Sequence, residues 1–401
     1  MPPRIKTPIP KRPFVDYLRF VLPWAANPGD NHQLMFERAR RRIQAEIENG
    51  TCKGTFANRG RYRFVFSIPL QGEFAATVWM GARDPARQKG GISVSLNPSK
   101  LEPGDMEHFH EVMERIVGPA YKRVLRGALI NRIDFAVDIV DARLDRLLVS
   151  YQYAQQFTVF GKTVKKGVVE TYNFGSEKSP YMTAVYDKNI ERRHRAIEAI
   201  AKHGLRNEPL KAYFIKQLDQ LHSTPPVVRV EVRGMQLKGL SLRDLHKMAN
   251  RFARFTFADL NGTGKPLPKK LLDAFMSLCR DRGVKAALDH FKGTPDVWKV
   301  NAFWRSHRAN WWKPELMMEQ ACDALRDSGI FPIEAFGVRD ADNGGRDVST
   351  ARPGKLHVAI ASQPAAGAKF QRIAPDFSKL SVKCTTIASK APTRGGIRRI
   401  G

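Results

Sequence analysis

Short runs in which apolar and polar residues alternate occupy the first half of the chain. YRFVFSIPL (62–70), FAATVWMGA (74–82) and GISVSLNP (91–98) are rich in β-branched and aromatic residues and are separated by Gly, Pro and Asn. Such alternation is typical of strands that bury one face, whereas residues 103–125 have the period of an amphipathic helix. We predict an α+β domain over residues 31–238, a central antiparallel sheet with helices on one face.

The periodicity becomes helical after about residue 238. We predict helices over 240–257, which begins after a Ser cap, over 268–283, which ends on Gly, and over 313–328. This helical region, 239–337, would serve DNA binding or dimerisation. Aromatic residues alternate with basic ones in it, and we predict core packing for its tryptophans, with origin recognition or dimer formation as the alternative: Trp304, Trp311 and Trp312.

Both ends of the chain are predicted to be unfolded. Residues 1–30 begin with a basic, Pro-rich stretch, and residues 338–401 mix Gly, Pro, Ser, Ala, Lys and Arg. Segments of this composition do not bury enough apolar surface to fold. We predict a flexible N-terminal segment and a disordered basic tail, which can add non-specific phosphate contacts.

The charge balance indicates a polyanionic partner. The chain has 67 Lys and Arg against 39 Asp and Glu, a net charge of +28, and nucleic acid is the natural partner for such an excess. No apolar run approaches the roughly 20 residues of a membrane-spanning helix, and no secretory signal is visible, so we expect a cytoplasmic protein without a membrane partner. The cysteines are isolated from one another and are expected to be reduced thiols: Cys52, Cys279, Cys322 and Cys384.

Candidate chemistry begins in the segment RIDFAVDIV (132–140). Its apolar residues share one face of a strand, which forces Arg132, Asp134 and Asp138 onto the other. Four residues of strand span roughly 13 Å. At most one of the two aspartates can therefore ligate a given ion directly.

The segment VVRVEVRG (227–234) has the same alternation. Its valines share one face, and Arg229, Glu231 and Arg233 share the other. Carboxylate oxygens suit Mg²⁺ or Mn²⁺, and arginines suit phosphate. The alternative is an exposed sheet face with weak ion pairs.

Tyrosines lie between these two strands in sequence. Tyr172 precedes a Gly-Ser turn, and the next strand carries Tyr186 and Lys188 on one face. A tyrosine can attack a phosphodiester where a metal ion or cations favour the phenolate. Isolated tyrosines in strands are more often part of a core.

Four motifs in order carry a family resemblance: RIDFAVDIV, TYNFGSEKSP, AVYDKNIER and RVEVRG. Over about residues 125–245 the chain resembles the plasmid and phage replication initiation factor family, the rolling-circle Rep proteins of the Rep_trans type. The resemblance implies that the protein nicks one strand of origin DNA, forming a 5′-phosphotyrosine bond and leaving a free 3′-OH. It also favours a homodimer.

The same resemblance assigns roles to residues. It implies Tyr186 as nucleophile, with Tyr172 and Tyr181 as alternatives, and a divalent metal, Mg²⁺ or Mn²⁺, held by Glu231 with Asp134 or Asp138. The turn departs from the family pattern, because Glu-Lys follows Gly-Ser where Arg is usual. The implied DNA-binding residues are Arg132, Lys178, Lys188, Arg192, Arg229 and Arg233.

Other nucleic-acid chemistries fit the sequence less well. His108 and His110 have the His-apolar-His spacing of a relaxase metal site, but they lie in a predicted helix, where residues two apart diverge. No tyrosine follows Tyr213, which excludes a tyrosine recombinase. The segment NGTGKP (261–266) lacks the spacing of a Walker A loop, so a separate helicase is expected. The rival function is a non-catalytic, sequence-specific DNA-binding protein that acts in regulation or packaging.

Overall fold

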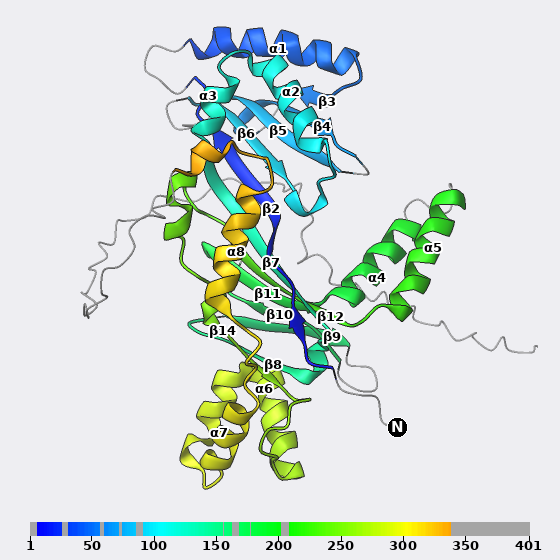
Figure 1. Ribbon diagram of the computed structural model, residues 1–401, viewed down its shortest axis with the longest axis vertical. Coiled ribbons are helices and arrows are strands. Elements are labelled where there is room, and N and C mark those ends of the chain that lie inside the picture. Colours follow the sequence, from blue (N-terminus) through cyan, green and yellow to red (C-terminus); the bar gives the residue numbers. More distant parts are fainter. Residues whose placement is uncertain are drawn as a thin grey trace, which may run out of the picture. The chain divides into compact units, whose positions relative to one another are not determined.

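The computed structural model describes residues 6–25, 31–56, 60–71, 74–85, 91–154, 156–162, 168–176, 178–201 and 208–337. This part of the chain has an α+β fold built on a large antiparallel sheet (Figure 1). The predicted disordered tail, 338–401, and the first five residues lie outside the described residues. The prediction of a flexible segment over 1–30 is wrong for Phe14–Leu22, which form a strand of the large sheet with Leu18 and Phe20 fully buried.

The large sheet has the strand order β3-β4-β5-β6-β2-β7-β12-β11-β10-β9, and β1 and β13 also pair with β7. A second sheet pairs β8 with β14. The strands are β1 (Ile9–Pro10), β2 (Phe14–Leu22), β3 (Lys53–Phe56), β4 (Tyr62–Pro69), β5 (Ala75–Ala82), β6 (Ile92–Leu96), β7 (Leu129–Val140), β8 (Leu147–Tyr151), β9 (Phe157–Lys162), β10 (Val168–Phe174), β11 (Tyr181–Asp187), β12 (Val227–Gly234), β13 (Leu240–Ser241) and β14 (Phe255–Asp259).

Helices follow and cover the strands. They are α1 (His32–Glu48), α2 (Asp105–Val117), α3 (Tyr121–Arg126), α4 (Lys188–Ala199), α5 (Glu208–Ser223), α6 (Lys269–His290), α7 (Val297–Ser306) and α8 (Pro314–Arg326). In Figure 1, α8 runs along β2 and β7, α1 and α2 lie over the β3–β6 part of the sheet, and α4 and α5 form a hairpin.

Alternation in the central strands confirms the predicted register. Ile133, Phe135 and Val137 of β7 are fully buried in the larger hydrophobic core, as are Val228 and Val230 of β12. Each such side chain contributes roughly 1.5–3 kcal/mol on full burial. This burial fixes the polar residues of both strands on the opposite side, which we call the polar face.

The predicted helix over 103–125 is two helices, α2 and α3. The chain turns at Gly118, whose φ of 83° is unfavourable for other residues, and Pro119 follows. The predicted end of a helix at Gly283 is a kink inside α6, where φ is 82°.

The predicted helix over 240–257 is wrong. Residues in this range form two 3₁₀ turns, Leu242–Lys247 and Phe252–Arg254, and then enter β14. The Asn250 side chain accepts a hydrogen bond from the Ala253 amide and donates to the Pro314 carbonyl, bonds that compete with a helix.

Two hydrophobic cores are present among the described residues. The larger one includes Leu242, Phe257 and Leu325 together with the sheet residues, so it extends across residue 238. The smaller one lies around α6 and α7 and contains Trp304. Trp312 is buried in the larger core and donates a hydrogen bond to the Phe252 carbonyl, in agreement with the predicted packing role.

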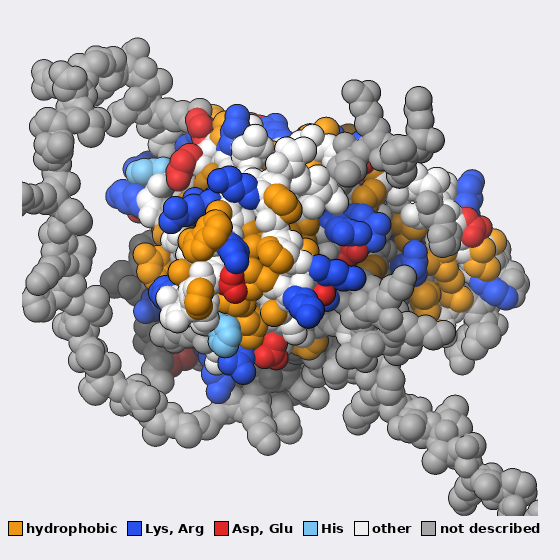
Figure 2. Space-filling view, turned by 90° about the horizontal axis from the view of Figure 1, so that it is seen from below, with side chains coloured by type: hydrophobic (Ala, Val, Ile, Leu, Met, Phe, Trp, Pro, Cys, Tyr) orange, Lys and Arg blue, Asp and Glu red, His pale blue; other side chains and the backbone are white. Residues whose placement is uncertain are grey.

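Figure 2 views the end of the molecule that carries α6 and α7. On this face, Lys and Arg side chains surround a patch of apolar side chains. Trp298 of α7 is 65% exposed. None of the described helices is both long enough and apolar enough to cross a membrane.

The buried thiols give a test of the fold. Cys52 and Cys279 are buried, and burial raises the pKa of each thiol to about 12, whereas Cys322 is partly exposed. Since the thiolate is the reactive form, we expect iodoacetamide at pH 8 to modify Cys322 well before Cys52 or Cys279 in the folded protein. Peptide mass spectrometry over time measures the order, and equal rates in the native state would contradict this packing.

Candidate active site

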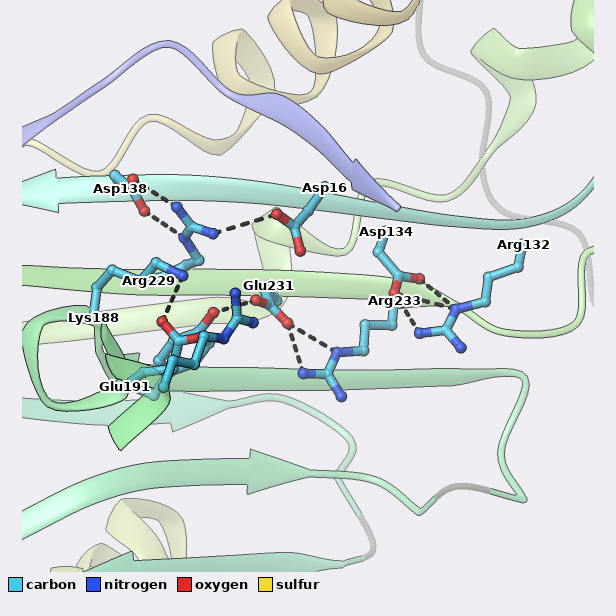
Figure 3. Close-up of polar contacts among 11 residues, drawn as sticks. Asp16, Arg132, Asp134, Asp138, Lys188, Glu191, Arg229, Glu231 and Arg233 are labelled. Atoms are coloured by element: carbon cyan, nitrogen blue, oxygen red, sulfur yellow. Dashed lines mark hydrogen bonds and ion pairs between the residues drawn. The ribbon is translucent and has the colours of Figure 1, made fainter. Parts of the chain in front are cut away.

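A tyrosine and a glutamate meet on the polar face of the sheet. The Tyr186 hydroxyl of β11 donates a short hydrogen bond to Oε1 of Glu231 on β12. The other carboxylate oxygen accepts from Nε and Nη2 of Arg233, at 3.0 and 2.6 Å (Figure 3). Tyr186 is only 8% exposed and Glu231 only 4%, so this contact is largely shielded from water.

The surroundings keep the phenol neutral and the carboxylate charged. Burial and the Glu231 charge raise the pKa of Tyr186 well above its ordinary value. Burial also opposes ionisation of Glu231, but Arg233, the Tyr186 hydroxyl and Arg229 outweigh it, and the pKa of Glu231 lies below its usual range. The stable arrangement is therefore a phenol that donates to a carboxylate.

Two further arginines are paired with aspartates on the same face. Arg132 and Asp134 of β7 are joined by contacts of 2.5–3.2 Å. Arg229 binds both oxygens of Asp138 at 2.6 and 2.9 Å and reaches Asp16 of β2 at 3.3 Å (Figure 3). Strand register explains the second pair, because Arg229 lies directly opposite Asp138.

A lysine lies where β11 passes into α4. Asp187 caps the helix by accepting from the amides of Asn189 and Ile190. The next residue, Lys188, is 6% exposed; its ammonium lies 2.7 Å from Glu191 and 5.7 Å from the centre of the Tyr186 ring. Burial and Arg229 lower the pKa of Lys188, although Glu191 opposes them.

The other candidate tyrosines lie on the opposite side of the sheet. Tyr172 pairs with Val185, is 4% exposed and belongs to the larger hydrophobic core, and burial raises its pKa to about 12. Tyr181 lies on the same side as Val185, since the pairing of β11 with β12 is regular, and its ring contacts Arg251. Of the three tyrosines, Tyr186 alone contacts the predicted acidic residues.

Two of the predicted DNA-binding residues are exposed and are not among these paired side chains. Lys178 is exposed in the turn between β10 and β11, and Arg192 is exposed on α4. His110, in the alternative His-apolar-His pair, lies on α2 and bonds the Tyr121 hydroxyl at 2.7 Å and the Gly329 carbonyl at 3.0 Å. These contacts give His110 a structural role.

The predicted metal ligands contact other side chains in this arrangement. Asp134 and Asp138 each bind an arginine through both carboxylate oxygens, and Glu231 binds Tyr186 through one oxygen and Arg233 through the other. Within the described residues, no group of three or more His, Cys, Asp or Glu side chains could hold a metal ion. A requirement for Mg²⁺ or Mn²⁺ stays a prediction.

Sequence reasoning missed two acidic members of the cluster. Asp16 comes from β2, whose segment FVDYLRFVL contains the alternation of a strand, broken by a bulge between Val15 and Tyr17. Glu191 lies one turn into α4 and bridges Lys188 and Arg195. The spacing of Lys188, Glu191 and Arg195, three and four residues apart on a helix, could have indicated these ion pairs from the sequence.

Comparison with known proteins gives little help with function. No family model matches the chain, and no curated protein matches it. Among solved structures, it is similar to a rolling-circle replication initiator protein from Geobacillus stearothermophilus, with 13% sequence identity over 57% of this chain and 75% of that chain. The TM-score is 0.28, and a similarity at this level carries no argument about activity.

Proposed function

We propose that the protein cleaves one strand of DNA with Tyr186 as the nucleophile. The observation that carries this proposal is the hydrogen bond from the Tyr186 hydroxyl to Glu231, whose other oxygen is held by Arg233. A nucleophile bonded to a base that a third group orients is the general pattern of covalent catalysis. The strong positive charge of the chain, +28, supports DNA as substrate.

The reaction is a transesterification. The Tyr186 oxygen attacks the phosphorus, the bond from phosphorus to the 3′ oxygen breaks, and the products are a 5′-phosphotyrosine and a 3′-OH. The tyrosine proton passes to Glu231 along the existing hydrogen bond, and the 3′ oxygen takes a proton from solvent. Lys188, 5.7 Å from the Tyr186 ring, supplies positive charge near the phosphate.

The finer proposal is a rolling-circle replication initiator that acts at an origin. It rests on the resemblance of the four ordered motifs, within which Tyr186 and Glu231 lie. A separate helicase and a homodimer are parts of this proposal. Arg192 and Lys178, both exposed, would contact phosphates away from the reacting group.

A second candidate is a non-catalytic DNA-binding protein. The pairing of Arg229 with Asp138 and Asp16 favours it, because these contacts join neighbouring strands and give the arginine a structural role. The low exposure of Tyr186, 8%, points the same way.

A nicking assay separates the two functions. Supercoiled plasmid carrying this gene with its flanking DNA is incubated with the protein and Mg²⁺ or Mn²⁺, then denatured and resolved on a gel. We expect open-circular DNA with protein attached covalently. DNA that stays supercoiled at every protein concentration would contradict the nicking activity and would favour the non-catalytic DNA-binding function.

Metal dependence is tested in the same assay. The sequence prediction is that EDTA stops cleavage and that excess Mg²⁺ or Mn²⁺ restores it. Cleavage at full rate in EDTA would contradict that prediction and would match the pairing of the carboxylates with arginines. DNA binding in EDTA is measured in parallel, because retained binding shows that the protein is still folded.

A further inference from the structure

A row of aromatic rings extends the polar face of the sheet away from Tyr186. Three rings, each with a guanidinium over it, lie on strands that neither Tyr186 nor Glu231 belongs to: Arg229 over Phe14 at 4.8 Å, Arg132 over Tyr17 at 4.6 Å, and Arg19 over Trp79 at 4.8 Å. Register places the row on the polar face, because Tyr17 pairs with Asp134 and Arg19 with Arg132.

These rings do not serve a hydrophobic core. Phe14, Tyr17 and Trp79 are all partly exposed, and among the described residues they belong to neither hydrophobic core and do not pack against one. Their neighbours on β2, such as Leu18 and Phe20, are fully buried on the other face. The polar face thus carries aromatic surface that packing does not require.

The charge of the row is also suited to a nucleic acid. Arg19 stacks on Trp79 and bonds the Ser93 hydroxyl at 3.3 Å, and the ion pairs of the described residues do not include it. By contrast, the arginines nearer Tyr186 are all paired with carboxylates. Arg19 therefore adds net positive charge at the Trp79 end of the row.

We propose that this row is a stacking track for single-stranded DNA, which binds the substrate on one side of the cleaved phosphate. Bases of single strands stack on aromatic rings and on guanidinium planes, and the cations contact phosphates. Five strand-to-strand steps separate β11 from β5, about 24 Å at about 4.8 Å each. This length matches about seven nucleotides at the B-form spacing of roughly 3.4 Å, or fewer in an extended strand. The position of the track beside the cleaved phosphate rests on the proposed function. The binding of single-stranded DNA by the track does not.

Binding of labelled oligo-dT tests the track without cleavage. In a Tyr186→Phe background, we expect Trp79→Ala to weaken binding about tenfold, since stacking of one base is worth about that much, and Trp79→Phe to retain most of it. Trp298→Ala, which removes a ring that is 65% exposed on α7, is the matched control and should bind as the parent does. Fluorescence anisotropy measures the affinity, and circular dichroism shows whether each variant is folded.

Salt dependence separates stacking from charge. Arg19→Ala should reduce the slope of log affinity against log salt by about 0.7, whereas Trp79→Ala should leave the slope unchanged. Duplex DNA of the same length should be insensitive to Trp79→Ala. The track is overturned if Trp79→Ala and Tyr17→Ala are folded and bind oligo-dT with unchanged affinity. It is also overturned if these variants lose as much affinity for duplex DNA as for oligo-dT, or if they lose affinity for oligo-U only.

The track and the nuclease can fail independently. Normal oligo-dT binding by the track variants together with normal nicking refutes the track and leaves Tyr186 as nucleophile. A tenfold binding loss in a protein that never nicks DNA refutes the nuclease and keeps the track.

Discussion

Tyr186→Phe abolishes strand cleavage, with a loss of more than about a thousandfold, because the variant lacks the oxygen that attacks the phosphate. Binding of single-stranded DNA should change little, since the ring and its neighbours remain. The variant should be destabilised by about 1.5–3 kcal/mol, the usual loss for a hydrogen bond to a charged group. The nicking assay on supercoiled DNA and anisotropy on oligo-dT measure the two effects.

Other tyrosines provide the controls. Tyr172→Phe and Tyr181→Phe remove hydroxyls on the opposite side of the sheet and should nick DNA at the parent rate. Tyr153→Phe changes a ring that is 81% exposed and should be neutral in every measurement. Full cleavage by Tyr186→Phe would exclude Tyr186, and loss in Tyr172→Phe or Tyr181→Phe alone would move the nucleophile there.

Glu231→Gln should both inactivate and destabilise the protein. The side chain of Glu231 is 5% exposed and that of Arg233 12%, so the substitution removes the carboxylate charge from a buried ion pair. Breaking a buried pair in this way costs about 3–5 kcal/mol. The amide cannot take the Tyr186 proton, and cleavage should fall at least about a hundredfold. Chemical denaturation and single-turnover cleavage measure the two losses.

Glu198→Gln is the matched control for this variant. Glu198 is exposed on α4, and the same change of charge there should alter the free energy of unfolding by no more than about 0.5 kcal/mol. Glu231→Gln with parental stability would contradict the buried pair with Arg233. A stable, folded Glu231→Gln that still cleaves at the parent rate would remove Glu231 from the mechanism.

The face of the polar residues of β7 and β12 could be predicted from alternation alone. Burial of Ile133, Phe135 and Val137 fixes the register of β7, and Asp134 and Asp138 then have only one side available. The same reasoning places Glu231 on β12. It does not tell which residues of different strands pair, such as Arg229 with Asp138, because that depends on the order of strands in the sheet.

Strand order explains the contacts between strands that the sequence did not predict. β12 lies between β7 and β11 although a helical hairpin separates β11 from β12 in the chain. This places Arg229 against Asp138 and Tyr186 beside Glu231. The contacts of Arg132 with Asp134 and of Arg233 with Glu231, by contrast, lie within one strand.

The helix predicted from local propensity over residues 240–257 does not form, because side chains and a distant strand compete for its backbone. The apolar spacing in residues 240–257 fits a helix, but the Asn250 side chain bonds the Ala253 amide, and Phe255 and Phe257 enter a strand against β8. That strand depends on a partner about a hundred residues earlier in the chain, at Leu147–Tyr151. No local pattern reports such a contact.

Mapping the covalent adduct is the most direct test of the central proposal, that Tyr186 attacks DNA. The protein is incubated with supercoiled DNA carrying its gene and flanking sequence, denatured, and digested with nuclease and trypsin, and the peptides are sequenced by mass spectrometry. We predict a nucleotide linked through its 5′ phosphate to Tyr186. A nucleotide on another residue, or nicked DNA without any adduct, would contradict the proposal.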